Sequence, residues 1–143
     1  MHVPQSISAA TELRQLTSVV RQIISPRTNS PIIQLFQDTM TGTYRISQPD
    51  VVVPEHIAQN ILARIRRPIP KGDLTGAQLI SMAFPLMSLK AAGAVVEDGQ
   101  LTKGPLKKGA TSATIHAIFN DMNPQAASKF INDVQAIVTK YNL

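Results

Sequence analysis

The residues of this sequence that could do polar chemistry are a glutamine–aspartate pair and two groups of cations. Gln37 and Asp38 follow a short apolar run and stand shortly before Gly42. The cations are three arginines and three lysines, namely Arg64, Arg66, Arg67, Lys103, Lys107 and Lys108. Such cations suit nucleic-acid or nucleotide phosphates. The arginines could equally serve a helix dipole, the lysines could protect a strand edge, and the pair could serve only in capping and turn formation.

The patterns typical of a catalytic or metal centre are missing from the sequence. His2, His56 and His116 lie far apart and have no ligand partners at metal-binding spacing. The nine carboxylates are scattered, with only Glu97 and Asp98 adjacent, whereas a catalytic metal needs converging carboxylates. No Walker A, dinucleotide-binding or serine-hydrolase motif is present, and there is no cysteine. We therefore predict no catalytic residue and no metal ligand, and we interpret His116 as a hydrogen-bonded structural histidine.

Composition indicates an ordinary globular protein with a basic surface. The 143 residues suit one domain or two small ones, and 43% are hydrophobic while 16% are charged. The net charge of +5 favours a polyanionic partner, although a mildly basic surface without a specific partner is equally compatible. Lys90 interrupts the longest apolar stretch, and no signal peptide is visible. We therefore expect an intracellular chain with no membrane partner.

The amino-terminal third must position Gln37 and Asp38. Residues 6–20 have helical periodicity, with Ser6 or Ser8 as the N-cap, and their apolar stripe predicts a packing element. That stripe consists of Ala9, Leu13, Leu16 and Val20. After two proline turns, the apolar run predicts a short buried strand formed by Ile32, Ile33, Leu35 and Phe36. Asp38 then is expected to cap the next helical turn.

The remaining patterns predict alternating short helices and hairpins. Val51–Val53 suits a strand end, a helix follows Pro54, and Thr75 is a candidate N-cap for a helix over residues 74–85. Asp98-Gly99 between two β-rich runs predicts a two-residue hairpin, with a further strand at Pro105–Lys108. Two closing helices are indicated, with N-caps at Ser112 and Asn123. The predicted class is α+β, with small antiparallel hairpins and a carboxyl-terminal helical pair.

Several short motifs occur in a specific order along nearly the whole chain. They are HVPQS at residues 2–6, SPxxNxP at 25–31, QDxxxG at 37–42, TGxQ at 75–78, DGxL at 98–101 and NPxxA at 123–127. Taken together, this series resembles the largest subunit of multisubunit DNA-directed RNA polymerases. The residues of these motifs are more similar to those of the eukaryotic, archaeal and large-DNA-virus subunits than to those of the bacterial one.

The resemblance implies a section of a larger multidomain subunit. Residues 1–48 would be the end of the active-site domain, and residues 49–143 the pore and funnel domain that lines the nucleotide-entry channel. Six residues would lie near the active centre, namely His2, Pro4, Gln5, Asn29, Gln37 and Asp38. Partners would be other polymerase subunits or the rest of the largest subunit, with DNA template and RNA. The location would be the nucleus, the cytoplasm, or a viral factory or virion.

The resemblance also implies what this chain lacks. The family carries its metal-binding aspartate loop just before HVPQS, and the sequence has none there. Magnesium is therefore implied for the whole polymerase but not for this chain, which we expect to be inactive alone.

The alternative interpretation is a free-standing basic module that binds nucleic acid or protein without catalysis. It would bind nucleic acid in a salt-dependent way. An independent enzyme is a third class, and it lacks the cluster of titratable groups that such a site requires.

Overall fold

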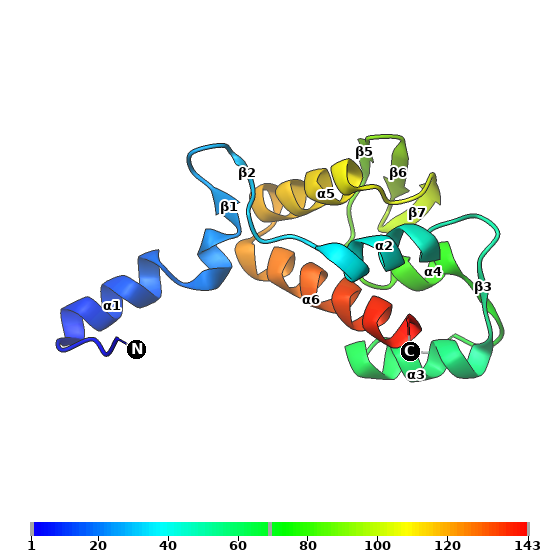
Figure 1. The fold of residues 1–143 in the computed structure, drawn as a ribbon, viewed down its shortest axis with the longest axis horizontal. Coiled ribbons are helices and arrows are strands. Elements are labelled where there is room, and N and C mark those ends of the chain that lie inside the picture. Colours follow the sequence, from blue (N-terminus) through cyan, green and yellow to red (C-terminus); the bar gives the residue numbers. More distant parts are fainter. Residues whose placement is uncertain (1, 69, 143) are drawn as a thin grey trace.

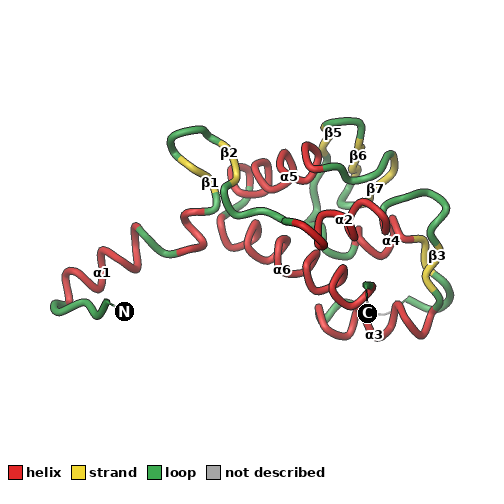
Figure 2. The backbone as a smooth tube through the Cα atoms, viewed as in Figure 1, coloured by secondary structure: helices red, strands yellow, loops and turns green. Residues whose placement is uncertain are grey.

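The computed structural model describes residues 2–68 and 70–142, and these residues form an α+β fold. The helices of this part are α1 Ile7–Leu16, α2 Gln37–Ile46, α3 Glu55–Ile65, α4 Gly76–Ser81, α5 Lys108–Asp121, α6 Pro124–Tyr141 and the 3-10 helix η1 Val19–Gln22. The strands are β1 Ile24–Ser25, β2 Ser30–Pro31, β3 Val52–Val53, β4 Leu74–Thr75, β5 Leu89–Ala91, β6 Ala94–Glu97 and β7 Gln100–Lys103. They pair into three small antiparallel sheets, β1–β2, β3–β4 and β5–β6–β7. The predicted class and the closing helical pair are confirmed (Figures 1 and 2).

Helix α6 lies at the centre of the fold. Its start is strongly encoded, because Asn123 Oδ1 accepts from the Ala126 N–H at 2.7 Å and Pro124 occupies the first turn. Its apolar face packs against α5, α3, α2 and η1 (Figure 1). The buried residues of that face are Ala127, Phe130, Ile131, Val134, Ile137 and Val138. They belong to one continuous core that reaches from Ile23 to the end of the helix.

Helix α2 approaches α6 so closely that one position admits no side chain. A Cβ at Gly42 would overlap Val138 Cγ1 and would lie 2.9 Å from Asn142 Nδ2. Gly42 is the glycine of the QDxxxG motif, and it is buried. The motif therefore marks a helix–helix contact, in which a missing methyl group lets the two backbones pack.

Two buried serines tie the β6–β7 hairpin to the helices. Ser81 Oγ, near the end of α4, accepts from the Leu101 N–H at 2.9 Å and donates to the Ala77 carbonyl at 2.6 Å. Ser47 Oγ, just after α2, accepts from the Leu106 N–H at 2.8 Å. Because buried N–H groups are costly to leave unpaired, these contacts hold the hairpin and the loop after it in register with the core.

Several local predictions are confirmed at their caps and turns. Ser6 Oγ accepts from the Ala9 N–H at 3.2 Å at the start of α1. Thr75 and Gln78 form a complete capping box for α4. Asp98 and Gly99 both adopt positive φ, at 48° and 75°, as a two-residue hairpin turn requires.

The predicted strand at residues 32–36 is wrong. Residues beyond β2 have no neighbouring strand to pair with, so the chain runs as irregular structure into α2. Leu35 is buried, but Ile32 and Phe36 are 54% and 58% exposed. Asp38 does not cap α2 either, because the N-cap is Phe36 and no side chain caps that helix. Asp38 instead lies in the first turn, where its charge suits the helix dipole.

The predicted strand at Pro105–Lys108 is also wrong, and α5 begins earlier than expected. Gly104 turns the chain with φ of 76°, Pro105 has no N–H, and the Leu106 N–H is bonded to Ser47. Helix α5 starts at Lys108, so Ser112 lies inside it rather than at its N-cap. The buried Ala110 near its start indicates that core packing outweighs the cap preference.

Helix α1 projects away from the rest of the molecule, and the segment that precedes it turns back beneath the helix (Figure 1). None of its residues is buried, and Leu13 and Leu16 are 50% and 61% exposed. Within the described residues, the apolar stripe of this expected packing element is therefore not buried. Within residues 2–68 and 70–142, no helix combines the length and apolar character needed to cross a bilayer.

The Gly42 contact predicts a specific mutational coupling. Gly42→Ala should lower the free energy of unfolding by about 1–3 kcal/mol, despite the better helix propensity of alanine, because its methyl group overlaps Val138. Adding Val138→Ala should recover part of this loss, since it removes the overlapping methyl group. Urea unfolding followed by circular dichroism measures both effects.

The matched control is Thr41→Ala, on the exposed side of the same helix. It should change the free energy of unfolding by less than about 0.5 kcal/mol. Strict additivity of Gly42→Ala and Val138→Ala would contradict the close-contact explanation.

Candidate functional site

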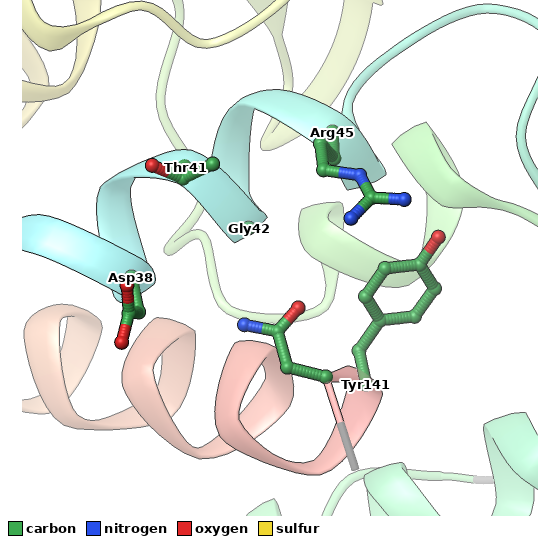
Figure 3. A pocket seen from close by; sticks show the side chains of 6 residues that line it. Asp38, Thr41, Gly42, Arg45 and Tyr141 are labelled. Carbon is green, nitrogen blue, oxygen red and sulfur yellow. The ribbon is translucent and has the colours of Figure 1, made fainter.

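Asp38 lies beside an open groove between α2 and the end of α6. The groove has a volume of about 730 Å³, and its lining includes Asp38 and Arg45 from α2 and Tyr141 from α6. Figure 3 shows the Arg45 guanidinium pointing toward the Tyr141 hydroxyl across the groove. Asp38 lies toward the other end of α2, and Gly42 lies between Asp38 and Arg45. An exposed guanidinium and a phenol can bind a polar or anionic group, but they provide no buried acid–base pair.

The predicted residues of the amino-terminal motif lie elsewhere. His2, Pro4 and Gln5 are exposed and precede α1, at the far end of the projecting arm (Figures 1 and 2). Gln37 and Asp38 begin α2 on the body of the molecule, and Gln37 has φ of 44°. Within this chain the structure therefore does not bring the two groups together.

Asn29 is held by α5, the first of the two closing helices. It lies in the β1–β2 turn with φ of 48°, and its Oδ1 is 3.2 Å from His116 Nε2 on α5. Asn120 Nδ2 lies 3.2 Å from the same imidazole, one helical turn further along. The interpretation of His116 as a hydrogen-bonded structural histidine is confirmed. The contact joins the SPxxNxP motif to α5 across 87 positions of the chain.

The three predicted arginines cluster where α3 ends. Arg64 is in the last turn, and Arg66 is the C-cap in a left-handed conformation with φ of 53°. That conformation reverses the chain and directs Arg67 to a different groove, against the β6–β7 turn. The cluster therefore combines the helix-end position expected from the sequence with one arginine that faces a cavity.

The three predicted lysines divide between two surfaces. Lys103, at the end of β7, shares a shallow groove with Lys90 of β5. Lys107 and Lys108, at the start of α5, line another groove together with Tyr44 of α2, which is 42% exposed. Sequence reasoning missed Tyr44 and Lys90, because only the folded chain brings them beside the predicted lysines. It also missed Arg45, which lines the groove beside Asp38 together with Tyr141 of α6. An exposed aromatic residue beside two lysines indicates a nucleic-acid-binding surface. The sequence does not show this combination, because Tyr44 is far from the two lysines along the chain.

The cations that line these grooves form no ion pairs within the part of the chain that the structure describes. Among the described residues, the only ion pair is Lys129 with Asp133, at 2.9 Å within α6. In the same part of the chain, no three histidine or acidic side chains gather as a metal site would require. The described residues thus present basic and polar surfaces.

A family model described as RNA polymerase Rpb1, domain 3, matches residues 22–143. The chain belongs to this family. Its curated relatives include the DNA-directed RNA polymerase II subunit RPB1-B of Trypanosoma brucei brucei, which is 28% identical over 167 residues. DNA-directed RNA polymerase subunit 1 of Acanthamoeba polyphaga mimivirus is 29% identical over 153 residues.

These relatives are much longer than the chain. The alignments cover 100% and 99% of this chain but 10% of each relative, so the chain spans about a tenth of their length. The resemblance to eukaryotic and large-DNA-virus largest subunits, drawn from the motif series, is confirmed.

For this member of the Rpb1 domain 3 family, the geometry explains several motif residues as structural. Gly42 admits α6, Thr75 and Gln78 cap α4, and Asn29 bonds to His116. A Cβ at Gly76, in the same motif as Thr75, would overlap the Ile46 carbonyl oxygen at the end of α2. These motif residues therefore serve mainly in close packing and helix capping rather than as reactive side chains.

The Asn29–His116 contact predicts a measurable coupling. Asn29→Gly keeps a residue suited to positive φ but removes the acceptor, and His116→Ala removes its partner. Each should lower the free energy of unfolding by about 0.5–1.5 kcal/mol, and the double variant should lose less than the sum of both. Urea titration of the four proteins of the cycle measures this.

Arg27→Gln, in the same turn, serves as the control and should be nearly neutral. Equal losses for the double variant and for the sum of the single variants would mean that the turn and α5 are not coupled through this hydrogen bond.

Proposed function

We propose that the chain is a section of a DNA-directed RNA polymerase largest subunit, acting in transcription as scaffold near the active centre and as wall of the nucleotide-entry channel. The observation that carries the proposal is the match of the Rpb1 domain 3 family over residues 22–143. The buried apolar residues in that range form one continuous core, from Ile23 to Val138. Residues 1–48 would continue the active-site domain, and residues 49–143 would form the pore and funnel domain.

The exposed stripe of α1 supports a larger assembly. We define the α1 stripe as Ala9, Leu13 and Leu16, which lie on one side of the helix. A helix that projects from the body with this stripe uncovered would be unstable alone, because isolated short helices are marginal in water. We propose that the preceding part of the same subunit covers the stripe.

The polar surfaces support the role as a channel wall. Lys107, Lys108 and Tyr44 would meet RNA or nucleotide phosphates, and the Arg45–Tyr141 groove adds a second polar surface. His2, Pro4, Gln5, Asn29, Gln37 and Asp38 stay predictions for positions near the active centre. Magnesium would be held by the aspartate loop of the rest of the polymerase, so the isolated chain would not synthesise RNA.

Assembly through the α1 stripe can be tested by co-expression. The tagged chain should co-purify with the other polymerase subunits and with the segment that carries the aspartate loop. Leu13→Glu combined with Leu16→Glu should lower this recovery roughly tenfold or more, because two apolar contacts are lost and two charges would be buried. Quantitative mass spectrometry of the purified complex is the readout.

Arg14→Glu is the matched control, since it reverses a charge on the opposite side of α1, changes the net charge by the same two units, and should leave recovery unchanged. A polymerase that fails to recruit the wild-type chain and transcribes fully without it would overturn the proposed function.

The second candidate function is the free-standing basic module, and the unpaired cations beside Tyr44 favour it. In that case the isolated chain would bind single-stranded RNA tightly, with a logarithmic affinity that falls steeply with the logarithm of salt concentration. We expect instead weak binding, further reduced severalfold by Lys107→Gln combined with Lys108→Gln. Fluorescence anisotropy at several salt concentrations distinguishes the two.

Lys140→Gln, on α6 away from these lysines, is the control for net charge. Tight RNA binding by the isolated chain that both lysine substitutions abolish would favour the free-standing module.

A further inference from the structure

The groove between α2 and the start of α5 has a lining that suits one class of ligand. We call it the Tyr44 groove, and its described lining consists of Met40, Thr41, Tyr44, Lys107 and Lys108, around a volume of about 270 Å³. Tyr44 and both lysines are exposed, so a ligand in the groove reaches the ring and the two ammonium groups. None of the described lining residues is acidic, and neither lysine forms an ion pair with a described residue. The groove therefore attracts an anion without an opposing charge.

One buried hydroxyl fixes the ring relative to the lysines. Ser47 Oγ donates to the Tyr44 carbonyl at 3.0 Å and accepts from the Leu106 N–H at 2.8 Å. Ser47 and Leu106 are both buried, so the core holds the two ends of this bridge. Lys107 and Lys108 follow Leu106 directly, at the positive end of the α5 dipole. The placement of a tyrosine beside two cations is therefore part of the fold before any ligand arrives, which lowers the entropic cost of binding.

The tyrosine ring selects among anions. An exposed aromatic face beside cations suits single-stranded nucleic acid, because a base stacks on the ring while the cations meet the flanking phosphates. An acidic side chain or a free phosphate has no aromatic face to offer the ring. In a duplex the neighbouring bases already cover both faces of each base, so only an unpaired base reaches Tyr44. Met40 beside it is half-buried and packs on the core, so it adds an apolar wall.

A third cation lies further along α2. Thr41 borders both the Tyr44 groove and the groove lined by Arg45 and Tyr141. The Arg45 guanidinium is exposed and points toward the Tyr141 hydroxyl (Figure 3), so a strand that crosses Thr41 meets donors for its next phosphate. Asp38 also lines that second groove, but it lies seven positions from Arg45, or about 10 Å along the helix axis. At that separation salt screens most of its repulsion.

We propose that the Tyr44 groove binds one unpaired nucleotide of a single nucleic-acid strand, with the base stacked on Tyr44 and the phosphate held by Lys107 and Lys108. The strand continues across Thr41 to Arg45. This inference deepens the proposed channel-wall role and rests on it. That role requires only cations beside phosphates, whereas the stacking adds a preference for an unpaired base.

The test titrates the full chain with a short RNA of mixed sequence, first as a single strand and then as a stable duplex with its complement. Fluorescence anisotropy of labelled RNA gives the affinity. The upfield ring-current shift of the Tyr44 ring protons, measured with unlabelled RNA, reports stacking. The chain has two tyrosines, so Tyr44→Phe assigns these protons. The single strand should bind severalfold more tightly than the duplex, and it alone should produce the shift.

Substitutions separate stacking from charge. Tyr44→Ala should weaken binding of the single strand roughly tenfold, because the stacking of one base is lost, and should leave duplex binding nearly unchanged. Tyr44→Phe keeps the ring and should bind as the wild type does. Phe36→Ala is the matched control, since Phe36 is 58% exposed at the N-cap of the same helix and is not among the described lining of the groove. It should leave the affinity unchanged.

The lysines should act through salt dependence. Lys107→Gln combined with Lys108→Gln should make the slope of logarithmic affinity against logarithmic salt concentration shallower by about 1.4, since two contacts to a single strand are lost. Single-stranded DNA of the same sequence is a further arm. Equal binding of DNA and RNA would mean that the sugar is not read, and weaker binding of DNA would mean that the 2′-hydroxyl is read. Both results support an unpaired nucleotide.

Three results would overturn the proposal. They are equal affinities for strand and duplex, equal effects of Tyr44→Ala and Phe36→Ala, and displacement of the RNA by a capped polyglutamate peptide at equal concentration. A chain that joins the polymerase but shows no stacking shift would contradict this site alone. A chain that shows the stacking shift but does not join the polymerase would contradict the channel-wall role and leave a strand-binding module.

Discussion

The close approach of α2 to α6 at Gly42 is the constraint on which the rest of the structure depends. Because that position has no side chain, the α2 backbone packs directly against the Val138 side chain, and α6 is the centre around which α3 and α5 also pack. Helix α2 then ends with Ser47 in position to bind the Leu106 N–H. The Lys107–Lys108 start of α5 comes to lie beside Tyr44 for the same reason. A larger residue at Gly42 would separate surfaces that are far apart in sequence.

Hydrogen bonds of polar side chains connect the packed helices to the short elements around them. Ser81 connects α4 to β7, and the hydrogen bond between Asn29 and His116 connects α5 to the β1–β2 turn. Each of these contacts joins a short element, too small to be stable alone, to a helix that is held by apolar packing. This explains how strands of two to four residues keep a defined position.

The surfaces left over differ in character. The α1 stripe is apolar and projects from the body, whereas the grooves beside Tyr44 and Arg45 are polar or basic. The groove lined by Arg67 and Leu86 combines a cation with exposed apolar surface. For a chain of the Rpb1 domain 3 family that spans about a tenth of its curated relatives, several such surfaces fit a part that meets different neighbours on different sides. Within the described residues, the cations that line these grooves form no ion pair, so their charge is available to those neighbours.

The sequence by itself determined the elements whose signals are local. The cap at Asn123 with Pro124, the capping box at Thr75 and the Asp98–Gly99 turn depend on a few neighbouring residues, and all were predictable. The motif series likewise predicted the family, because the resemblance depends on the order of residue types along the chain rather than on tertiary contacts. The tertiary structure alone decided whether the apolar runs at Leu13–Leu16 and Ile32–Phe36 would be covered. Burial depends on which partner faces a segment, and neither run finds a complete one in this chain. It alone also brought Asn29 to His116, Tyr44 to Lys107, and Arg67 to Asp98, because side chains far apart in sequence meet only when the core between them has packed.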